Sequence, residues 1–328
     1  MTTLSLLKLK SLVNKDLQEI NATIDEQVLE AAPDNAKQIF HYILKHRGKQ
    51  LRPILLLLIC YAIKPNISPD SKTNIVLVAA AIELIHVASL IHDDLIDDAK
   101  ERRGQESVNS KWGKEIAITT GVYFYSNALC LISKTGSSKI LESLSKAVKL
   151  MCASEISQFN HRYQFVSEQD NHYVVHGKTA ALFETTCECA TYLLNTSDYD
   201  QILKFGTNMG YLLQLSDDYM DVMSDGDQLK KSIGQDIHSG QYTLPIILLF
   251  NKLNAEDQAK LKKALLQGTK SLNILKTYFT KYNIAEDIKQ KLLHYYQSGK
   301  QSLEMLEPSI YKDQLDTIIT YTYHRAFQ

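Results

Sequence analysis

The stretch IVLVAAAIELIHVASLIHDDLIDD, residues 75–98, decides the fold. It contains neither proline nor glycine, is apolar nearly all the way round up to Ile96, and ends in the aspartates 93, 94, 97 and 98. At about 100° per residue, Glu83, His86, Ser89, Asp93 and Asp97 fall on one face of a helix. This pattern is typical of a central helix in a large bundle, whose polar stripe faces something polar.

The stretch GYLLQLSDDYMD, residues 210–221, repeats the arrangement. Here Gly210, Gln214, Asp217, Asp218, Asp221 and, beyond this stretch, Asp225 share one helix face. Carboxylates spaced i and i+4 repel each other unless a cation is bound. Ligands that offer only oxygen suit Mg²⁺, which is usually completed by waters and substrate phosphates. The two clusters therefore predict a magnesium site that binds a diphosphate. We expect both acidic rows to face one cavity.

Basic residues stand beside both clusters, as diphosphate binding requires. They are Arg102 and Arg103 after the first cluster, Lys230 and Lys231 after the second, and Lys49 and Arg52 within RGKQLRP, residues 47–53. Arginine offers a bidentate fork to a phosphate, and lysine offers a mobile point charge. The ordered combination, rather than any single cation, favours this chemistry.

The rest of the chain predicts an all-α protein of one large domain, residues 1–328. No proline lies between Pro69 and Pro245, and strand alternation is scarce. Residues 1–34 are expected to form an N-terminal helix and residues 251–328 the C-terminal helices. The helices expected are 3–31, 35–46, 50–63, 72–99, 105–111, 114–133, 138–163, 167–192, 198–222, 227–231, 240–250, 255–267, 269–280, 283–298 and 310–325.

Composition excludes several classes of protein. A net charge of −1 with 22% charged residues argues against nucleic-acid binding. The longest apolar run, residues 54–63, is shorter than the roughly 20 residues of a membrane span. The N-terminus has no cleavable apolar core. The five cysteines lack metal-ligand or redox spacing. We expect a soluble, cytoplasmic protein with no transmembrane segment.

Residues 83–104 resemble the first aspartate-rich motif of the trans-polyprenyl diphosphate synthases, and residues 210–221 resemble the second. Further matches follow in the order of that family. They are Gly48-Lys49 to Pro53, Glu155 with Gln158, Tyr173 to Phe183 around Lys178-Thr179, Gly234 to Asp236, and Gly240 to Pro245. The resemblance is strongest over residues 35–250.

The resemblance implies an α-helical bundle of the isoprenoid synthase type around a central cavity, usually a homodimer. It joins isopentenyl diphosphate to an allylic diphosphate and gives an all-trans product. The implied ligands of several Mg²⁺ ions are Asp93, Asp97 and Asp217, supported by Asp94, Asp218 and Asp221. The implied contacts of the allylic diphosphate are Arg102, Lys178, Gln214 and Lys231, with Thr179 near the reacting carbons. Those of isopentenyl diphosphate are Lys49, Arg52, His86 and Arg103.

The chain also departs from the family pattern. Gln241 stands where the family has a lysine facing the allylic diphosphate, so one charge-assisted contact is missing. Arg47, Gln50 and Leu213 replace a glycine, an arginine and a phenylalanine, and these changes look tolerable. Val122 replaces an aspartate, and nothing in the sequence explains it.

Product length is predicted from the turn before Asp93. The residues four and five positions earlier, Ser89 and Ala88, are small, whereas short-chain members of the family tend to have aromatic residues there. This favours a product of C20 or longer, of the octaprenyl type. Small residues that merely permit close helix packing are the alternative interpretation.

Three other functions compete. Glu83 and His86 form an E-x-x-H pattern, but a di-iron carboxylate bundle needs a second copy and the chain has none. A class I terpene cyclase would lack the second aspartate motif and the contacts to isopentenyl diphosphate. A non-catalytic or weakly active subunit of a heteromeric synthase finds support only in Gln241.

Overall fold

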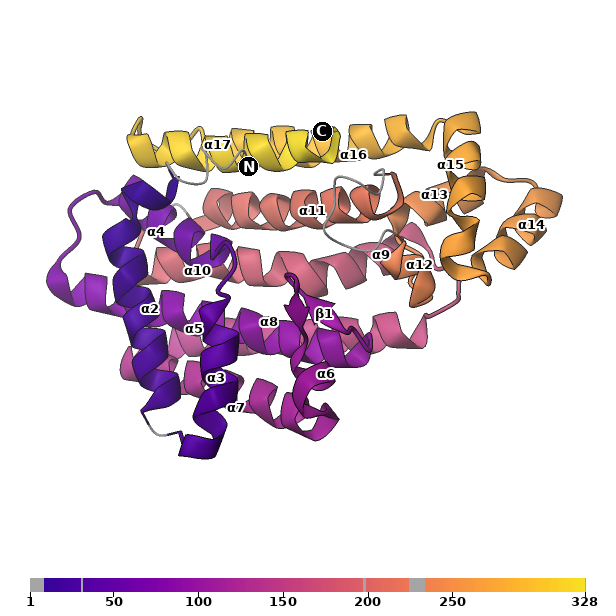
Figure 1. The fold of residues 1–328 in the computed structure, drawn as a ribbon. Helices are drawn as coiled ribbons and strands as arrows, with labels where there is room; N and C mark the ends of the chain where they lie inside the picture. Colours follow the sequence, from indigo (N-terminus) through magenta and orange to yellow (C-terminus); the bar gives the residue numbers. More distant parts are fainter. Residues whose placement is uncertain (1–8, 31, 197–198, 224–233, 328) are drawn as a thin grey trace. The chain divides into compact units, whose positions relative to one another are not determined.

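A computed structural model describes residues 9–30, 32–196, 199–223 and 234–327 (Figure 1). The regular structure of the described residues is helical, apart from one two-stranded hairpin. This predominance of helix confirms the all-α prediction. It divides into two compact units. Unit 1 comprises residues 1–146, 185–202 and 305–315, and unit 2 comprises residues 147–184, 203–304 and 316–328. That the chain forms one domain stays a prediction.

Unit 1 is built around one long helix, α5, Pro69–Ile96, which packs mainly against α7, Lys114–Lys134. Ser68 caps its N-terminus by accepting a hydrogen bond from the Ser71 backbone, and Pro69 begins it, where a missing N–H costs nothing. Its residues from Ile75 to Ile85 are mostly buried, as the apolar sequence predicts. The other elements that lie wholly in unit 1 are α2 (Asn14–Leu29), α3 (Asp34–Lys45), α4 (Leu51–Ile63), β1 (Glu101–Arg102), β2 (Gln105–Glu106) and α6 (Val108–Trp112).

The hairpin of β1 and β2 returns the chain after α5. Glu101 pairs with Glu106 and Arg102 with Gln105. The two residues between the strands, Arg103 and Gly104, both have positive φ, 55° and 75°. This is the geometry of the tight turns that match the twist of a hairpin. The hairpin contradicts the helix predicted over 105–111, of which only α6 forms, because Gly104 favours a turn.

Unit 2 gathers the helices of the second half of the chain. Those that lie wholly in it are α9 (Glu168–Val175), the π-helix η1 (His176–Ala180), α12 (Gln235–His238), α13 (Leu244–Lys252), α14 (Ala255–Leu265), the 3₁₀-helix η2 (Gly268–Ser271), α15 (Leu272–Lys281), α16 (Ile284–Ser302) and the 3₁₀-helix η3 (Arg325–Phe327). Four helices have residues in both units: α8 (Ser138–Asn160), α10 (Ala181–Leu194), α11 (Tyr199–Met223) and α17 (Ile310–His324).

Helix α11 approaches the π-helix closely in unit 2. A Cβ on Gly210 would lie 2.4 Å from the Ala180 Cα, so only glycine fits at this crossing. The helix predicted over 167–192 is divided into three elements in the structure, because the π-helix η1 lies between α9 and α10. The predicted helix 227–231 lies outside the described residues.

Among the described residues, two helices, α5 and α7, are long and apolar enough to cross a membrane by length and composition alone. Within the chain, 67% of the most apolar window of α5 is buried, as in the core helix of a folded bundle. The corresponding share of α7 is 44%, which leaves part of its apolar surface exposed.

Candidate functional site

The first aspartate motif lies where α5 ends. Asp93 and Asp94 occupy the last turn, and the Asp97 backbone N–H, at the C-cap, donates to the Asp93 carbonyl at 2.9 Å. Asp93 and Asp97 are therefore one turn apart on the same face, as the sequence predicts. Both are half-buried, whereas Asp94 is buried.

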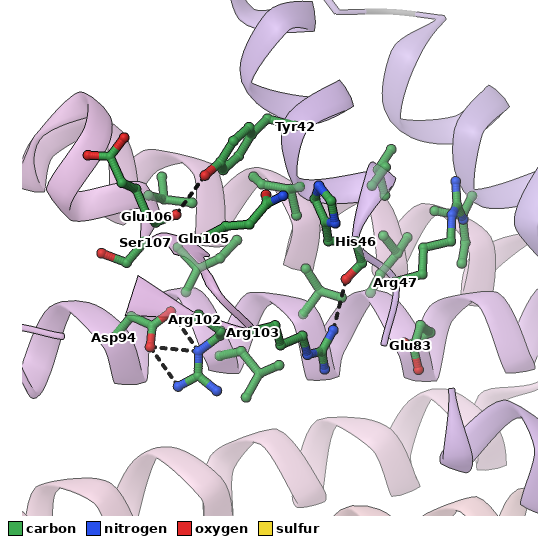
Figure 2. Close-up of a pocket in the computed structure, with 18 residues that line it drawn as sticks. Tyr42, His46, Arg47, Glu83, Asp94, Arg102, Arg103, Gln105, Glu106 and Ser107 are labelled. Carbon is green, nitrogen blue, oxygen red and sulfur yellow. Dashed lines mark hydrogen bonds and ion pairs between the residues drawn. The ribbon is translucent and has the colours of Figure 1, made fainter. Parts of the chain in front are cut away.

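The hairpin brings Arg102 onto the Asp94 carboxylate. The Arg102 Nε lies 2.6 and 2.7 Å from the two carboxylate oxygens, and Nη2 lies 2.6 Å from Oδ1 (Figure 2). Since Arg102 engages both oxygens of Asp94, this fork neutralises the one buried acid of the motif. Asp94 thereby fixes the orientation of Arg102.

Arg103, at the tip of the same hairpin, lies against the loop after α3. Its Nη1 donates to the His46 carbonyl at 2.9 Å (Figure 2). Its guanidinium also occupies the space where Gly48, at φ +59°, lacks a side chain: a Cβ there would lie 2.4 Å from the Arg103 Cζ. The glycine of RGKQLRP thus makes room for an arginine that the resemblance assigns to isopentenyl diphosphate.

These arginines line a cavity of about 90 Å³ in unit 1. Its walls come from α3, α5 and the hairpin, and its charged lining residues are Arg47, Glu83, Asp94, Arg102, Arg103 and Glu106. Arg47 is held by α2, because its guanidinium bonds to Asn21 and forms an ion pair with Asp25. Arg47 therefore has a structural partner where the family has glycine.

Arg52 and His86 are not among the residues that line this cavity, but both interact electrostatically with residues that do. Arg52, on α4, is only 9% exposed. Burial lowers the pKa of its guanidinium to about 10, even though the nearby Glu83 carboxylate raises this pKa. The pKa of His86 falls well below its usual value, because burial and then Arg52, Arg103 and Arg102 disfavour the imidazolium. His86 is therefore neutral near pH 7 and offers a hydrogen bond rather than a charge. Lys49 is exposed in the loop before α4.

Ala88 and Ser89 lie one turn before the acidic motif. Ala88 is buried, and the Ser89 hydroxyl donates to the His86 carbonyl at 2.9 Å. Because Ser89 bonds to its own helix, neither side chain projects far from α5. Whether this surface is the wall of an elongation pocket stays a prediction.

The second aspartate motif lies on α11, within unit 2. Asp217 is exposed and forms an ion pair with Arg325 of η3. Asp218 is buried, and its pKa is raised well above the usual value, first by burial and then by the nearby charge of Asp236. Asp221 is half-buried and accepts a hydrogen bond from the Asp236 backbone N–H at 3.4 Å.

Thr179, Gln214 and Asp218 form a chain of hydrogen bonds. The Thr179 hydroxyl donates to Gln214 Oε1 at 2.6 Å, and Gln214 Nε2 donates to Asp218 Oδ1 at 2.8 Å. Lys178, the neighbour of Thr179 on the π-helix, contacts Glu155 Oε2 and Gln158 Oε1, both at 2.8 Å. A π-helical turn displaces one residue from the α-helical register, and such turns are frequent at functional sites.

The aspartates of each motif offer the oxygen donors that Mg²⁺ prefers. Within the described ranges, however, no three histidine, cysteine or acidic side chains already converge as a metal site. The donor set fits a hard divalent cation that keeps waters and receives its remaining ligands from a diphosphate. Lys230 and Lys231, predicted beside the second motif, lie outside the described residues.

Three features of the candidate site have no role that follows from the sequence. Glu83 appeared on the polar face of α5 without a role, although a carboxylate on an otherwise apolar helix is a signal for a buried charge. Glu155 was recognised only as part of a motif, and the structure pairs it with Lys178. The π-helix has no marker in the sequence.

Comparisons with known proteins agree with this geometry. Residues 33–282 match the polyprenyl synthetase family. The chain is 31% identical to octaprenyl diphosphate synthase of Escherichia coli (strain K12) over 268 residues, 81% of either chain. A decaprenyl diphosphate synthase from Rhodobacter capsulatus has a similar fold, with a TM-score of 0.90 and 23% identity over 98% of this chain and 100% of that one. A polyprenyl synthase from Caulobacter crescentus, crystallised with calcium and isoprenyl diphosphate, gives a TM-score of 0.88 at 22% identity, over 97% of each chain.

Proposed function

The chain belongs to the polyprenyl synthetase family and is a prenyltransferase, and we propose that it condenses isopentenyl diphosphate with an allylic diphosphate to give an all-trans polyprenyl diphosphate. The observation that carries the proposal lies in unit 1. There the last turn of α5 presents acids for a cation, and the hairpin beside it presents two fixed arginines. A diphosphate bound through a metal needs the acids, and a diphosphate bound without metal needs the arginines.

The diphosphate of isopentenyl diphosphate would bind Lys49, Arg52, His86 and Arg103. Three of these provide positive charge, and neutral His86 provides a hydrogen bond without adding to the repulsion among the cations. Arg103 is already oriented by the His46 carbonyl, so little side-chain entropy is lost when it binds.

The allylic diphosphate would be held by Arg102, Lys178, Gln214 and Lys231. Asp94 fixes Arg102, and Glu155 with Gln158 fixes Lys178. Thr179 orients the Gln214 amide, which in turn bonds to buried Asp218. Cations and amides fixed in advance stabilise the departing diphosphate more than the intact substrate, which lowers the barrier to ionisation.

The family depends on divalent metal, and we propose Mg²⁺ as the ion. Asp93, Asp97 and Asp217 would be direct ligands, with Asp94, Asp218 and Asp221 in support. Bound Mg²⁺ would neutralise the charge that develops on the leaving diphosphate. The double bond of isopentenyl diphosphate then forms the new carbon–carbon bond to the allylic cation, and the released diphosphate accepts the proton that is lost. No protein nucleophile is required.

We propose a product of C20 or longer. The small side chains of Ala88 and Ser89 support this, since Ser89 is bonded back onto its own helix. The relatives named above as octaprenyl and decaprenyl diphosphate synthases make long products, consistent with this proposal.

We also propose a cytoplasmic homodimer. Its support is α7, where Ile118 and Val122, one turn apart, are 51% and 52% exposed. An apolar stripe on a long helix is a surface that a second copy can cover. Val122, unexplained by the sequence, would contribute to this surface.

The test is to incubate the purified protein with Mg²⁺, labelled isopentenyl diphosphate and dimethylallyl, geranyl, farnesyl or geranylgeranyl diphosphate in turn. We expect chain elongation that stops when EDTA is added and resumes with excess Mg²⁺. Chromatography of the dephosphorylated products gives their length. Cyclic hydrocarbons formed without isopentenyl diphosphate would indicate a terpene cyclase, and activity that appears only with a second protein would indicate a subunit of a heteromeric synthase.

A further inference from the structure

Glu83 is a buried acid that lines the cavity of unit 1. It lies in the middle of α5, is 4% exposed, and its Oε2 has no hydrogen-bond partner among the described residues. An unsatisfied carboxylate oxygen in such a place costs free energy unless it is protonated or faces positive charge. Its position therefore calls for a role beyond packing.

Positive groups act on Glu83 from several parts of unit 1, though none of them comes from α7, the main packing partner of α5. They are Arg52 on α4, Arg103 at the hairpin tip, Arg47 in the loop after α3 and Lys10 before α2, while neutral His86 lies one turn away on α5. The pKa of Glu83 is raised to about 7, because burial raises it by more than these cations lower it. Glu83 is thus a carboxyl group among arginines that changes between its neutral and its charged form near pH 7.

A bound diphosphate would add negative charge to the same arginines. Arg52 and Arg103 are two of the four residues proposed to hold isopentenyl diphosphate, and both interact electrostatically with Glu83. Two anions that share one set of cations raise each other's pKa, so the weaker acid of the two takes up a proton.

We propose that Glu83 is the counter-anion of Arg52 and Arg103 before isopentenyl diphosphate binds, and that it is neutralised by one proton from solvent when isopentenyl diphosphate binds. The proton goes to a Glu83 carboxylate oxygen, and no other bond forms or breaks. Arg52 and Arg103 are then released from Glu83 to the diphosphate. The inference rests on the proposed function, and it makes Glu83 a positioning residue.

The proposal fixes the direction of the pH dependence. Below pH 7 Glu83 is already protonated, so binding needs no proton from solvent. Above pH 7 Glu83 must take up a proton from solvent each time a diphosphate binds, so affinity falls by up to about tenfold per pH unit. Replacing Glu83 with glutamine removes this dependence, because the amide does not titrate.

Titration calorimetry tests the proposal. Isopentenyl diphosphate alone, in EDTA and without an allylic substrate, is titrated at pH 7.5 into wild type, Glu83→Gln and Glu101→Gln in buffers of different ionisation enthalpy. Glu101 is an exposed acid on β1 and serves as the control. We expect wild type and Glu101→Gln to take up about three quarters of a proton more than Glu83→Gln, because a group with a pKa of about 7 is already about one quarter protonated at pH 7.5. The ligand's own ionisation is common to all three proteins and cancels.

Equal proton uptake in all three proteins overturns the inference while leaving the proposed function intact. Absence of binding to wild type at any pH contradicts the proposed function itself. Should Glu83→Gln fail to fold, wild type labelled with ¹³C-glutamate answers the question by difference infrared spectroscopy. A protonated carboxyl band should grow on binding at pH 8, and its absence would rule out protonation of Glu83.

Discussion

Replacing Gly48 with alanine should separate the binding of the two substrates. Gly48 has φ +59°, and an added Cβ would lie 2.4 Å from the Arg103 guanidinium. The left-handed backbone costs an alanine about 1–2 kcal/mol. The clash itself costs little stability, because the guanidinium is the free end of a long side chain and can move away. Moving it, however, takes Arg103 from the position in which it would meet the diphosphate.

The expected loss follows from the contact that is removed. A hydrogen bond to a charged group is worth about 1.5–3 kcal/mol. Since about 1.4 kcal/mol corresponds to a factor of ten, the KM for isopentenyl diphosphate should rise by about 10- to 100-fold. The KM for the allylic substrate should change little, because Arg102 stays on Asp94.

Gly136→Ala is the matched control. Gly136 has φ +65°, close to that of Gly48, but a Cβ there meets nothing within 4 Å. Both variants should therefore lose a similar amount of thermal stability, measured by calorimetry, and only Gly48→Ala should weaken isopentenyl diphosphate binding in steady-state assays. An unchanged KM in Gly48→Ala, or equal rises for both substrates, would refute the reasoning.

Two further variants test product length and allylic binding. Ala88→Phe places an aromatic ring one turn before the first motif, and the products should shift towards C15 or C20 in a radiolabel assay; an unshifted distribution would count against this wall. Gln241→Lys restores the charge that the family has at a position that is 8% exposed here, and turnover should rise or the apparent allylic KM fall. Unchanged steady-state kinetics would show that Gln241 does not face the allylic diphosphate.

The main helices could be predicted from the sequence because their pattern is local. The prediction of 72–99 is close to α5, Pro69–Ile96, since a proline start and an unbroken apolar run fix that helix without help from its neighbours. The hairpin was missed because Glu101, Arg102, Gln105 and Glu106 are polar and show no strand alternation. The turn of the hairpin depends on the positive φ of Arg103 and Gly104. In the sequence, the single glycine is the one signal of this turn.

The sequence proposes candidate residues by their type, but it does not give their partners. Two clusters of acids, each followed by basic residues, favour the binding of a cation and an anion, whereas a single acidic run is usually a solvated face. That Arg102 turns back to Asp94, while Arg103 turns to the His46 carbonyl, depends on the hairpin. The role of Glu83 depends on burial, because its pKa near 7 arises from the loss of water around it. Burial is a tertiary property that one sequence does not give.

Arginine already neutralises part of each aspartate motif, and this bears on how the metal would bind. Arg102 uses both oxygens of Asp94, and Arg325 pairs with Asp217. Asp94 therefore suits a supporting role, since a direct bond to Mg²⁺ would have to displace the fork. Asp217 is exposed, and an exposed ion pair contributes little stability, so exchanging Arg325 for a divalent ion costs less. On this reasoning Asp93, Asp97 and Asp217 are the residues whose carboxylates can change partner when substrate and metal arrive together.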